Sequence, residues 1–268
     1  ELLQVQTTRN HAHQGRIAQA LTAVRRAANR PGGHDEQVLR LHARLLRESD
    51  AKRELAEVLE TLTALDGAPV AIRAADLREL AALQEQDLTD AETAVSTWRR
   101  AFDLEPDEPK ALAALERIHR KQEDWSALRA LLETALEASD ETRRSGLAAR
   151  LGHLLLEQDD DVEAARAHFE SALALDATNT TALAGLRRVA EQCDDADLLL
   201  EVCEREATDC DDADRMGELA RAAIPRLRER GDLEGAHAWT VRWTRLAPSE
   251  RDALVERAGL EATLSLQS

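Results

Sequence analysis

The sequence is poor in the residues that β-strands favour. Only 2% of its 268 residues are aromatic, tyrosine is absent, and the apolar 43% is mostly alanine and leucine. Strands favour aromatic and β-branched residues, whereas alanine and leucine are strong helix formers. Glycine and proline, which break helices, number only 11 and 6. This composition excludes a largely β fold and predicts an all-α protein.

Long hydrophobic runs are also missing. No apolar stretch approaches the roughly 20 residues that a membrane-spanning helix needs, so we expect no membrane contact. The chain begins with Glu1 rather than methionine, so we expect a fragment of a longer protein. We predict a cytoplasmic location, with a removed signal peptide as the open alternative. Arginine outnumbers lysine by 32 to 3, which is typical of GC-rich genomes and favours a bacterial source.

Cysteine is too scarce for a zinc site. Cys193, Cys203 and Cys210 form no CxxC pair and have no histidine nearby, so we predict reduced thiols, with Cys203 in the core. A metal at His11 and His13 is disfavoured because residues two apart point to different helix faces. The acidic run at 209–214 lacks the alternating ligands of a calcium loop. We therefore predict no metal and no cofactor.

Basic residues are outnumbered by acidic ones, 35 to 52, giving a net charge of −17. This balance disfavours nucleic acid, which is bound through lysine and arginine. Residues 157–214 hold 18 of the acidic residues and only 4 of the basic ones. Two interpretations of this region remain open. It is either a solvated face with helix-capping aspartates or a docking surface for a basic partner.

Apolar residues recur at helical spacing throughout the chain. Ala94, Trp98 and Ala101 lie at i, i+4 and i+7 on one helix face, and Pro106 ends that helix. Six further positions match Trp98, and we call all seven the anchors: Val24, Leu59, Leu132, Phe169, Cys203 and Thr240. Between the anchor helices lies a second helical pattern, so the repeating unit is a pair of antiparallel helices.

Helix pairs at a period near 34 residues resemble the tetratricopeptide repeat (TPR) family. The family's small residue at repeat position 20, large apolar residue at 24, small residue at 27 and proline at 32 are matched by Ala94, Trp98, Ala101 and Pro106. The resemblance implies an all-α, right-handed α-solenoid of about seven helix-turn-helix repeats, forming one superhelical domain over residues 1–268. We assign Trp98, Phe169 and Trp239 to packing between repeats.

The sequence departs from the family pattern in two ways. The family's tyrosine at position 11 is never present, and the anchors are separated by 35, 39, 34, 37, 34 and 37 residues. The alternation of short and long repeats indicates duplication of a two-repeat unit of 71 residues. We expect the extra residues of the long repeats to lie in the turns at 84–90, 157–163 and 228–234.

The resemblance also implies where a partner would bind. TPR arrays usually hold a peptide or a partner helix in a concave groove lined by the first helix of each pair. The positions that match this groove are mostly basic: Arg78, Lys110, Arg117, Arg120, Lys121, His153, Arg188 and Arg228. We therefore predict a groove that binds an acidic segment or a terminal carboxylate. The alternative is that these arginines form ion pairs within the array.

No pattern in the sequence indicates catalysis. There is no glycine-rich phosphate loop, and the histidines are dispersed along the chain. We predict a non-enzymatic scaffold or adaptor that binds a protein or peptide, with self-association through exposed solenoid ends as a possibility. The alternative is a regulatory or sensor region of a larger signalling protein.

Overall fold

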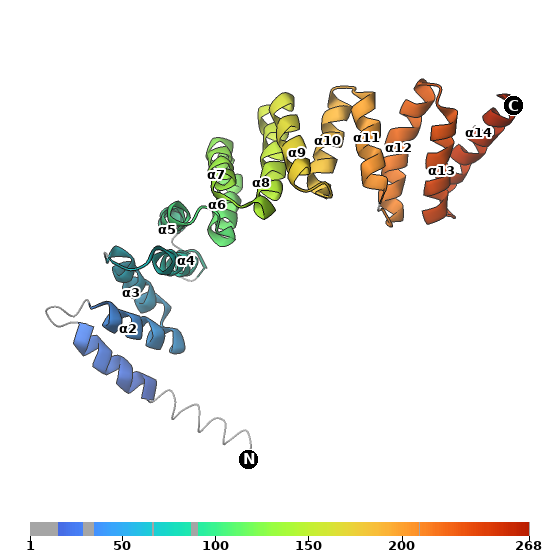
Figure 1. Ribbon diagram of the computed structural model, residues 1–268. Coiled ribbons are helices and arrows are strands. Elements are labelled where there is room, and N and C mark those ends of the chain that lie inside the picture. The colour runs from blue at the N-terminus through green and yellow to red at the C-terminus, as the bar shows by residue number, and fades with distance from the viewer. Residues whose placement is uncertain (1–15, 29–34, 66, 87–90, 209, 268) are drawn as a thin grey trace, which may run out of the picture. The chain divides into compact units, whose positions relative to one another are not determined.

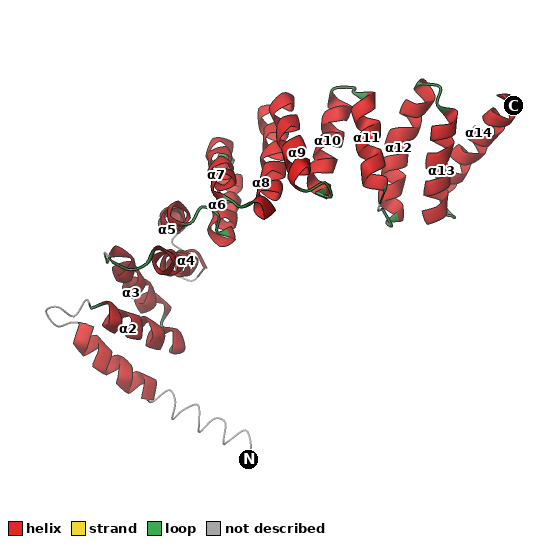
Figure 2. Cartoon of the chain, viewed as in Figure 1, coloured by secondary structure: helices red, strands yellow, loops and turns green. Residues whose placement is uncertain are grey.

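The computed structural model describes residues 16–28, 35–65, 67–86, 91–208 and 210–267. Within these ranges every regular element is a helix, and none is a strand (Figure 2). The predicted all-α class and its helical repeats are therefore confirmed. The chain forms two compact units, Glu1–Ala138 and Ser139–Ser268. The single domain over residues 1–268 stays a prediction.

The first unit contains a helix over residues 16–28 and six further helices. These are α2 (Glu36–Glu48), α3 (Lys52–Ala64), α4 (Val70–Gln86), α5 (Ala91–Leu104), α6 (Pro109–Gln122) and α7 (Trp125–Ala138). Each of the helices α2 to α6 packs on the next one along the chain.

The second unit continues the same pattern from α8 to α14, and these helices lie side by side in chain order (Figure 1). They are α8 (Glu141–Leu154) with its π-helical extension η1 (Leu155–Asp159), α9 (Val162–Leu175), α10 (Thr180–Gln192), α11 (Ala196–Ala207), α12 (Ala213–Glu229), α13 (Leu233–Leu246) and α14 (Arg251–Gln267).

The described helices form six complete pairs, from α2/α3 to α12/α13. We call the first helix of each pair the A helix and the second the B helix. The residue 16–28 helix carries the first anchor, Val24, and precedes these pairs as the B helix of the first repeat. The helix α14 follows the last pair in the position of a further A helix.

A common turn joins the A and B helices of five of the six described pairs. A residue with positive φ follows the A helix, and the B helix begins two residues later. These left-handed residues are Asp50, Glu123, Asp160, Asp194 and Gly231. Aspartates then cap several B helices: the Asp161, Asp195 and Asp232 side chains accept hydrogen bonds from backbone N–H groups three residues on. The turn between α4 and α5 lies outside the described residues.

The A helices of the long repeats are extended, so the predicted placement of the extra residues in turns at 157–163 and 228–234 is wrong. Residues 87–90 of the turn predicted at 84–90 lie outside the described residues. Helices α4 and α12 have 17 residues each, and α8 is continued by the five residues of η1, whereas α2, α6 and α10 have 13 or 14. An added turn of helix satisfies its own backbone hydrogen bonds, while an added loop would leave polar groups to be satisfied by water.

The anchors form the core of both units. All seven are buried, and Leu59, Leu132, Phe169, Cys203 and Thr240 have essentially no exposed surface. Trp98 and Trp239, assigned to packing from the sequence, are 6% and 5% exposed. Trp243 is 1% exposed, and it occupies the position where four other repeats carry alanine.

Candidate functional site

The predicted groove residues all lie on A helices. Arg78 is on α4, the residues at 110, 117, 120 and 121 are on α6, His153 is on α8, Arg188 is on α10 and Arg228 is on α12. These residues divide between the two compact units. The first five belong to the first unit and the last three to the second.

Three of the predicted arginines form ion pairs that join successive A helices. Arg117 contacts Glu85, Arg188 lies 2.7 Å from Glu157, and the closest atoms of Arg228 and Glu256 are 3.2 Å apart. These contacts agree with the alternative that the arginines pair within the array. The side chains of Arg117 and Arg228 are still 58% and 54% exposed. Guanidinium groups with this much exposed surface keep N–H donors open to solvent beside the paired acid.

Two other predicted residues support the fold. The guanidinium of Arg78 is mostly buried and lies 2.6 Å from Glu105 and 3.7 Å from Glu108, at the turn that leads into α6. The imidazole of His153 lies 3.2 Å from the carbonyl of Thr181 and meets the Phe169 ring edge-on at 5.0 Å. Both side chains are occupied by neighbouring elements of the same unit.

The remaining predicted residues all lie on α6 and differ in their partners. Arg120 is 3.8 Å from Glu116 on the preceding turn. Lys110 and Lys121 are exposed, and neither forms an ion pair with any residue in the described part of the chain. Lys121 is therefore a cation that is free to meet a ligand.

A cleft of about 750 Å³ brings two of the predicted residues together in the first unit. We call it the α4–α6 cleft. It is lined by Glu85, Glu92, Val95, Ser96, Arg99, Arg117, Ile118, Lys121 and Gln122. Arg117 and Lys121 are one helical turn apart on α6, so their side chains lie on the same face. Val95 and Ile118 provide half-buried apolar surface beside them.

The acid that meets Arg117 is held in place by a residue assigned from the sequence to packing alone. The indole N–H of Trp98 donates a hydrogen bond to Oε2 of Glu85 at 3.2 Å, while Oε1 of the same carboxylate faces Arg117. Trp98 thus connects the repeat core to the α4–α6 cleft. The sequence pattern gives its burial but not the direction of its N–H group.

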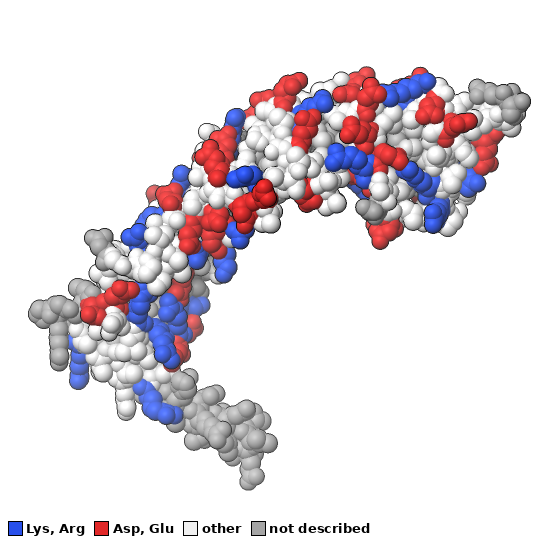
Figure 3. All heavy atoms as spheres, viewed as in Figure 1, with Lys and Arg blue, Asp and Glu red and all other residues white. Residues whose placement is uncertain are grey.

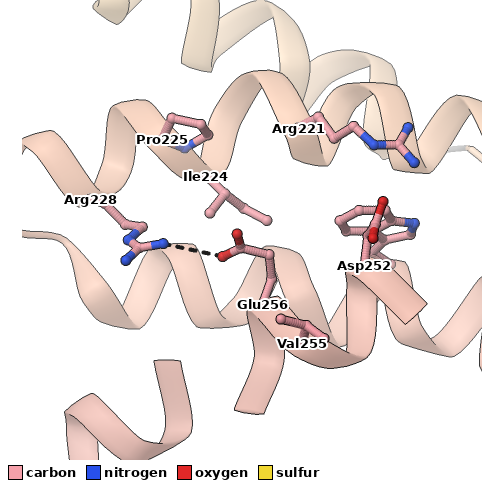
Figure 4. A pocket seen from close by; sticks show the side chains of 8 residues that line it. Arg221, Ile224, Pro225, Arg228, Asp252, Val255 and Glu256 are labelled. Atoms are coloured by element: carbon pink, nitrogen blue, oxygen red, sulfur yellow. Dashed lines mark hydrogen bonds and ion pairs between the residues drawn. The ribbon is translucent and has the colours of Figure 1, made fainter. Parts of the chain in front are cut away.

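A second cleft, of about 550 Å³, lies between α12, α13 and α14 and includes Arg228 (Figure 4). Arg221 and Arg228 project from α12 on either side of Ile224 and Pro225, and Glu256 of α14 reaches Arg228. Arg221 also lies over the Trp243 ring, 4.9 Å from its centroid. The sequence analysis missed Arg221, although its spacing of seven from Arg228 places it on the same helix face.

Neither a protein-family model nor a curated protein sequence matches the chain. Its fold, in contrast, matches solved structures. The C-terminal part of a TPR repeat-containing protein from Cytophaga hutchinsonii has a TM-score of 0.55 at 14% identity, over 91% of this chain and 95% of that one. A structure of Naa15/Naa10 bound to HypK-THB also has a TM-score of 0.55 at 14% identity, over 95% of this chain and 38% of that one.

The chain has the tetratricopeptide-repeat fold. This conclusion rests on the six described helix pairs, their buried anchors and the match to a TPR repeat-containing protein over nearly the full length of both chains. We therefore call the chain the TPR array. The predicted groove residues all lie on the A helices of this fold.

Much of the acidic charge between residues 157 and 214 has a structural role in the TPR array. Asp161, Asp195 and Asp212 cap helices, and Glu206 is almost fully buried between Arg187 and Arg215. On the face shown in Figure 3, acidic and basic side chains are interspersed rather than gathered by sign. These contacts favour the cap interpretation of this region over a docking surface for a basic partner.

The described part of the TPR array contains no group of three or more potential metal ligands, and none of its helices is long and apolar enough to cross a membrane. The residues considered for metal binding at His11 and His13 lie outside the described residues. Asp209 of the acidic run at 209–214 lies outside them too.

The three thiols of the TPR array differ in exposure, which predicts a difference in reactivity. Cys193 is exposed and Cys210 partly exposed, whereas Cys203 is buried and its burial raises the pKa of the thiol to about 12. The thiolate is the reactive species, so we expect iodoacetamide at pH 8 to modify Cys193 first and Cys203 only on unfolding. Mass spectrometry of peptides after timed alkylation measures this order. Modification of Cys203 at the rate of Cys193 in the folded chain would contradict it.

Proposed function

We propose that the TPR array is a non-enzymatic protein-interaction scaffold that binds an acidic segment of a partner protein on its A helices. The observation that carries the proposal is the α4–α6 cleft. There, Arg117 and the unpaired Lys121 lie one turn apart beside the apolar side chains of Val95 and Ile118. A segment with carboxylates next to an apolar side chain matches both features of the cleft.

The contact between Arg117 and Glu85 leaves part of the arginine accessible to a ligand carboxylate. The Arg117 side chain is more than half exposed, whereas that of Glu85 is only 20% exposed. When a ligand carboxylate takes over Arg117, Glu85 keeps its hydrogen bond from Trp98. The arginine can then hold the new carboxylate through two parallel N–H bonds, and Lys121 adds a second cation.

The TPR fold supports the scaffold class as a whole. A structure with the same fold contains Naa15/Naa10 bound to HypK-THB, so the fold occurs in a protein assembly. In the second unit, the cleft between α12, α13 and α14 likewise places two cationic side chains, Arg221 and Arg228, beside apolar surface. We propose it as a further contact point for the same kind of segment.

A charge-reversal experiment tests the α4–α6 cleft. The probe is a fluorescein-labelled 12-residue peptide of alternating glutamate and leucine, and fluorescence anisotropy at 50 mM salt measures its binding. We expect R117E/K121E to weaken binding at least tenfold, because two attractive charges become repulsive. The matched control R44E/R53E makes the same change of net charge at exposed positions on α2 and α3, outside the cleft. We expect that control to stay within twofold of the native chain.

The same variants identify the natural partner. Affinity capture with the native chain and with R44E/R53E is expected to retain proteins that R117E/K121E loses. The variant R117E/R188E extends this comparison to the second unit. If R117E/K121E bound the glutamate-leucine peptide as tightly as the native chain, or retained every captured protein, the α4–α6 cleft would not be the binding site.

A further inference from the structure

A different cleft in the first unit contains a buried amide without a hydrogen-bond partner. This cleft, of about 710 Å³, lies between the B helices α3 and α5, with α4 beneath them. We call it the α3–α5 cleft. Gln84 of α4 lines it and is only 8% exposed, yet its Oε1 has no hydrogen bond from any residue in the described part of the chain. The α3–α5 cleft shares Ser96 alone with the α4–α6 cleft of the proposed function.

Gln84 occupies a position where the helix otherwise carries apolar side chains. It continues the buried stripe of α4 formed by Leu77, Leu80 and Ala81, at spacings of seven, four and three residues. Burying an amide there without a partner costs stability, since the group loses its water and gains no hydrogen bond. A methionine of similar length would fill the same space without this cost. The buried amide therefore points to a ligand that donates a hydrogen bond to it.

Three of the other polar side chains that line the α3–α5 cleft are also acceptors. The hydroxyls of Thr61, Ser96 and Thr97 each donate to a carbonyl of their own helix, at 2.8 to 3.0 Å. Their donor hydrogens are thus used, and their lone pairs remain available. Together with Oε1 of Gln84, they form a site that accepts hydrogen bonds. A ligand that satisfies such a site must carry several N–H donors.

The charged residues at the rim of the α3–α5 cleft favour a positively charged ligand. Glu60 is paired with Arg100 at 3.2 Å, and Arg100 also donates to Thr63 at 3.3 Å. Glu57 forms no ion pair with a described residue, so its carboxylate is the unbalanced charge of the cleft. The side chains of Ala56 and Leu80 line the same cleft and offer apolar surface for an aliphatic stem.

We infer that the α3–α5 cleft binds a guanidinium side chain from a basic segment of a partner protein. The guanidinium brings five N–H donors and no acceptor, which matches the acceptors of the cleft, and its charge is balanced by Glu57. The terminal torsion of a glutamine side chain is broad, so the Gln84 amide can turn toward the ligand. The net charge of −17 attracts such a basic partner at long range.

The test uses the full chain and two probes that differ only in charge and donors. The first probe is Nα-acetyl-arginine N-methylamide, and the second is its neutral citrulline counterpart. Two-dimensional NMR follows the side-chain amide signal of Gln84, assigned by its absence in Q84M. For an arginine probe of this size we expect half-saturation at low millimolar concentration. The citrulline probe should bind at least tenfold more weakly.

Variants separate a binding role of Gln84 from a structural one. We expect Q84M to raise Tm by about 3 °C, because an unpartnered buried amide is removed, and to weaken binding of the arginine probe at least fivefold. E57Q should weaken binding similarly without changing Tm. The control Q86M alters an exposed glutamine of the same helix and should change neither quantity. Binding of the glutamate-leucine peptide by Q84M should stay unchanged, since it uses the α4–α6 cleft.

Three results would overturn the inference. The first is equal binding of the citrulline and arginine probes, because charge and donor number would then not matter. The second is a Q84M variant that binds the arginine probe as the native chain does. The third is a loss of stability in Q84M, which would show that the amide has a structural role in the free chain.

Discussion

Replacing Phe169 with alanine is expected to lower the free energy of unfolding of the second unit by about 3–5 kcal/mol. The ring is fully buried and is in contact with helices on both sides. A Cβ atom at Gly152 of α8 would come within 2.7 Å of the ring, and one at Gly185 of α10 within 2.3 Å. Truncation leaves a cavity between three helices, which their backbones can close only in part. Urea denaturation followed by circular dichroism measures the loss.

The fit between Phe169 and the two glycines allows a control that depends on shape. G185A alone should destabilise the unit, because the added methyl group meets the ring. Combining G185A with F169L should cost less than the sum of the two single changes, since the smaller side chain makes room for the methyl group. Hydrogen exchange should show the loss of protection first in α8, α9 and α10. Strict additivity of the two changes would contradict the packing described here.

Removing the carboxylate of Glu206 is expected to destabilise the second unit by about 3 kcal/mol. Glu206 is only 6% exposed, contacts Arg215 of α12, and lies 3.6 Å from Arg187 of α10. E206A would leave two arginines partly buried without their shared counter-charge. We place the cost at the lower end of the usual range because both guanidinium groups retain some exposure. Urea denaturation of E206A against the native chain measures it.

Replacing all three charged residues tests the cause of that loss. The triple variant R187L/E206L/R215L removes the ion pairs together with the need for them, so we expect it to recover most of the stability lost in E206A. Glu204 is the matched control. It lies two residues away on α11 but is half exposed in its pair with Arg242, so E204A should cost less than about 1 kcal/mol. Equal losses in E206A and E204A would show that burial of the carboxylate is unimportant.

The sequence predicts the helices of this protein well because their pattern is local. A spacing of i, i+4 and i+7, as in Ala94, Trp98 and Ala101, defines one face of a helix whatever the rest of the chain does. These three residues are indeed buried on one face of α5. The same dependence on a local apolar pattern explains why the extra residues of the long repeats were predicted to lie in turns. A polar run such as residues 157–159 has no apolar spacing to show that a helix continues through it.

The candidate binding sites were predicted only in part. The sequence places Arg117 and Lys121 on one face of α6, and the structure puts both in the α4–α6 cleft. It does not show that Glu85, 32 residues earlier, meets Arg117, or that Arg78 is mostly buried against Glu105. Such contacts depend on which rotamers of two distant helices come together. The spacing of residues along the sequence does not predict these contacts.

The sequence by itself therefore determined the helical repeat fold and its buried anchors, since both follow from the spacing of apolar residues along each helix. Only the tertiary structure decided what the polar residues do. It showed that the Glu206 side chain is only 6% exposed at a position where four other repeats have alanine, and that Oε1 of Gln84, at an apolar position, has no hydrogen bond from a described residue. A polar side chain is exposed, paired or unpartnered according to its neighbours in space, and for Glu206 those neighbours lie on two other helices.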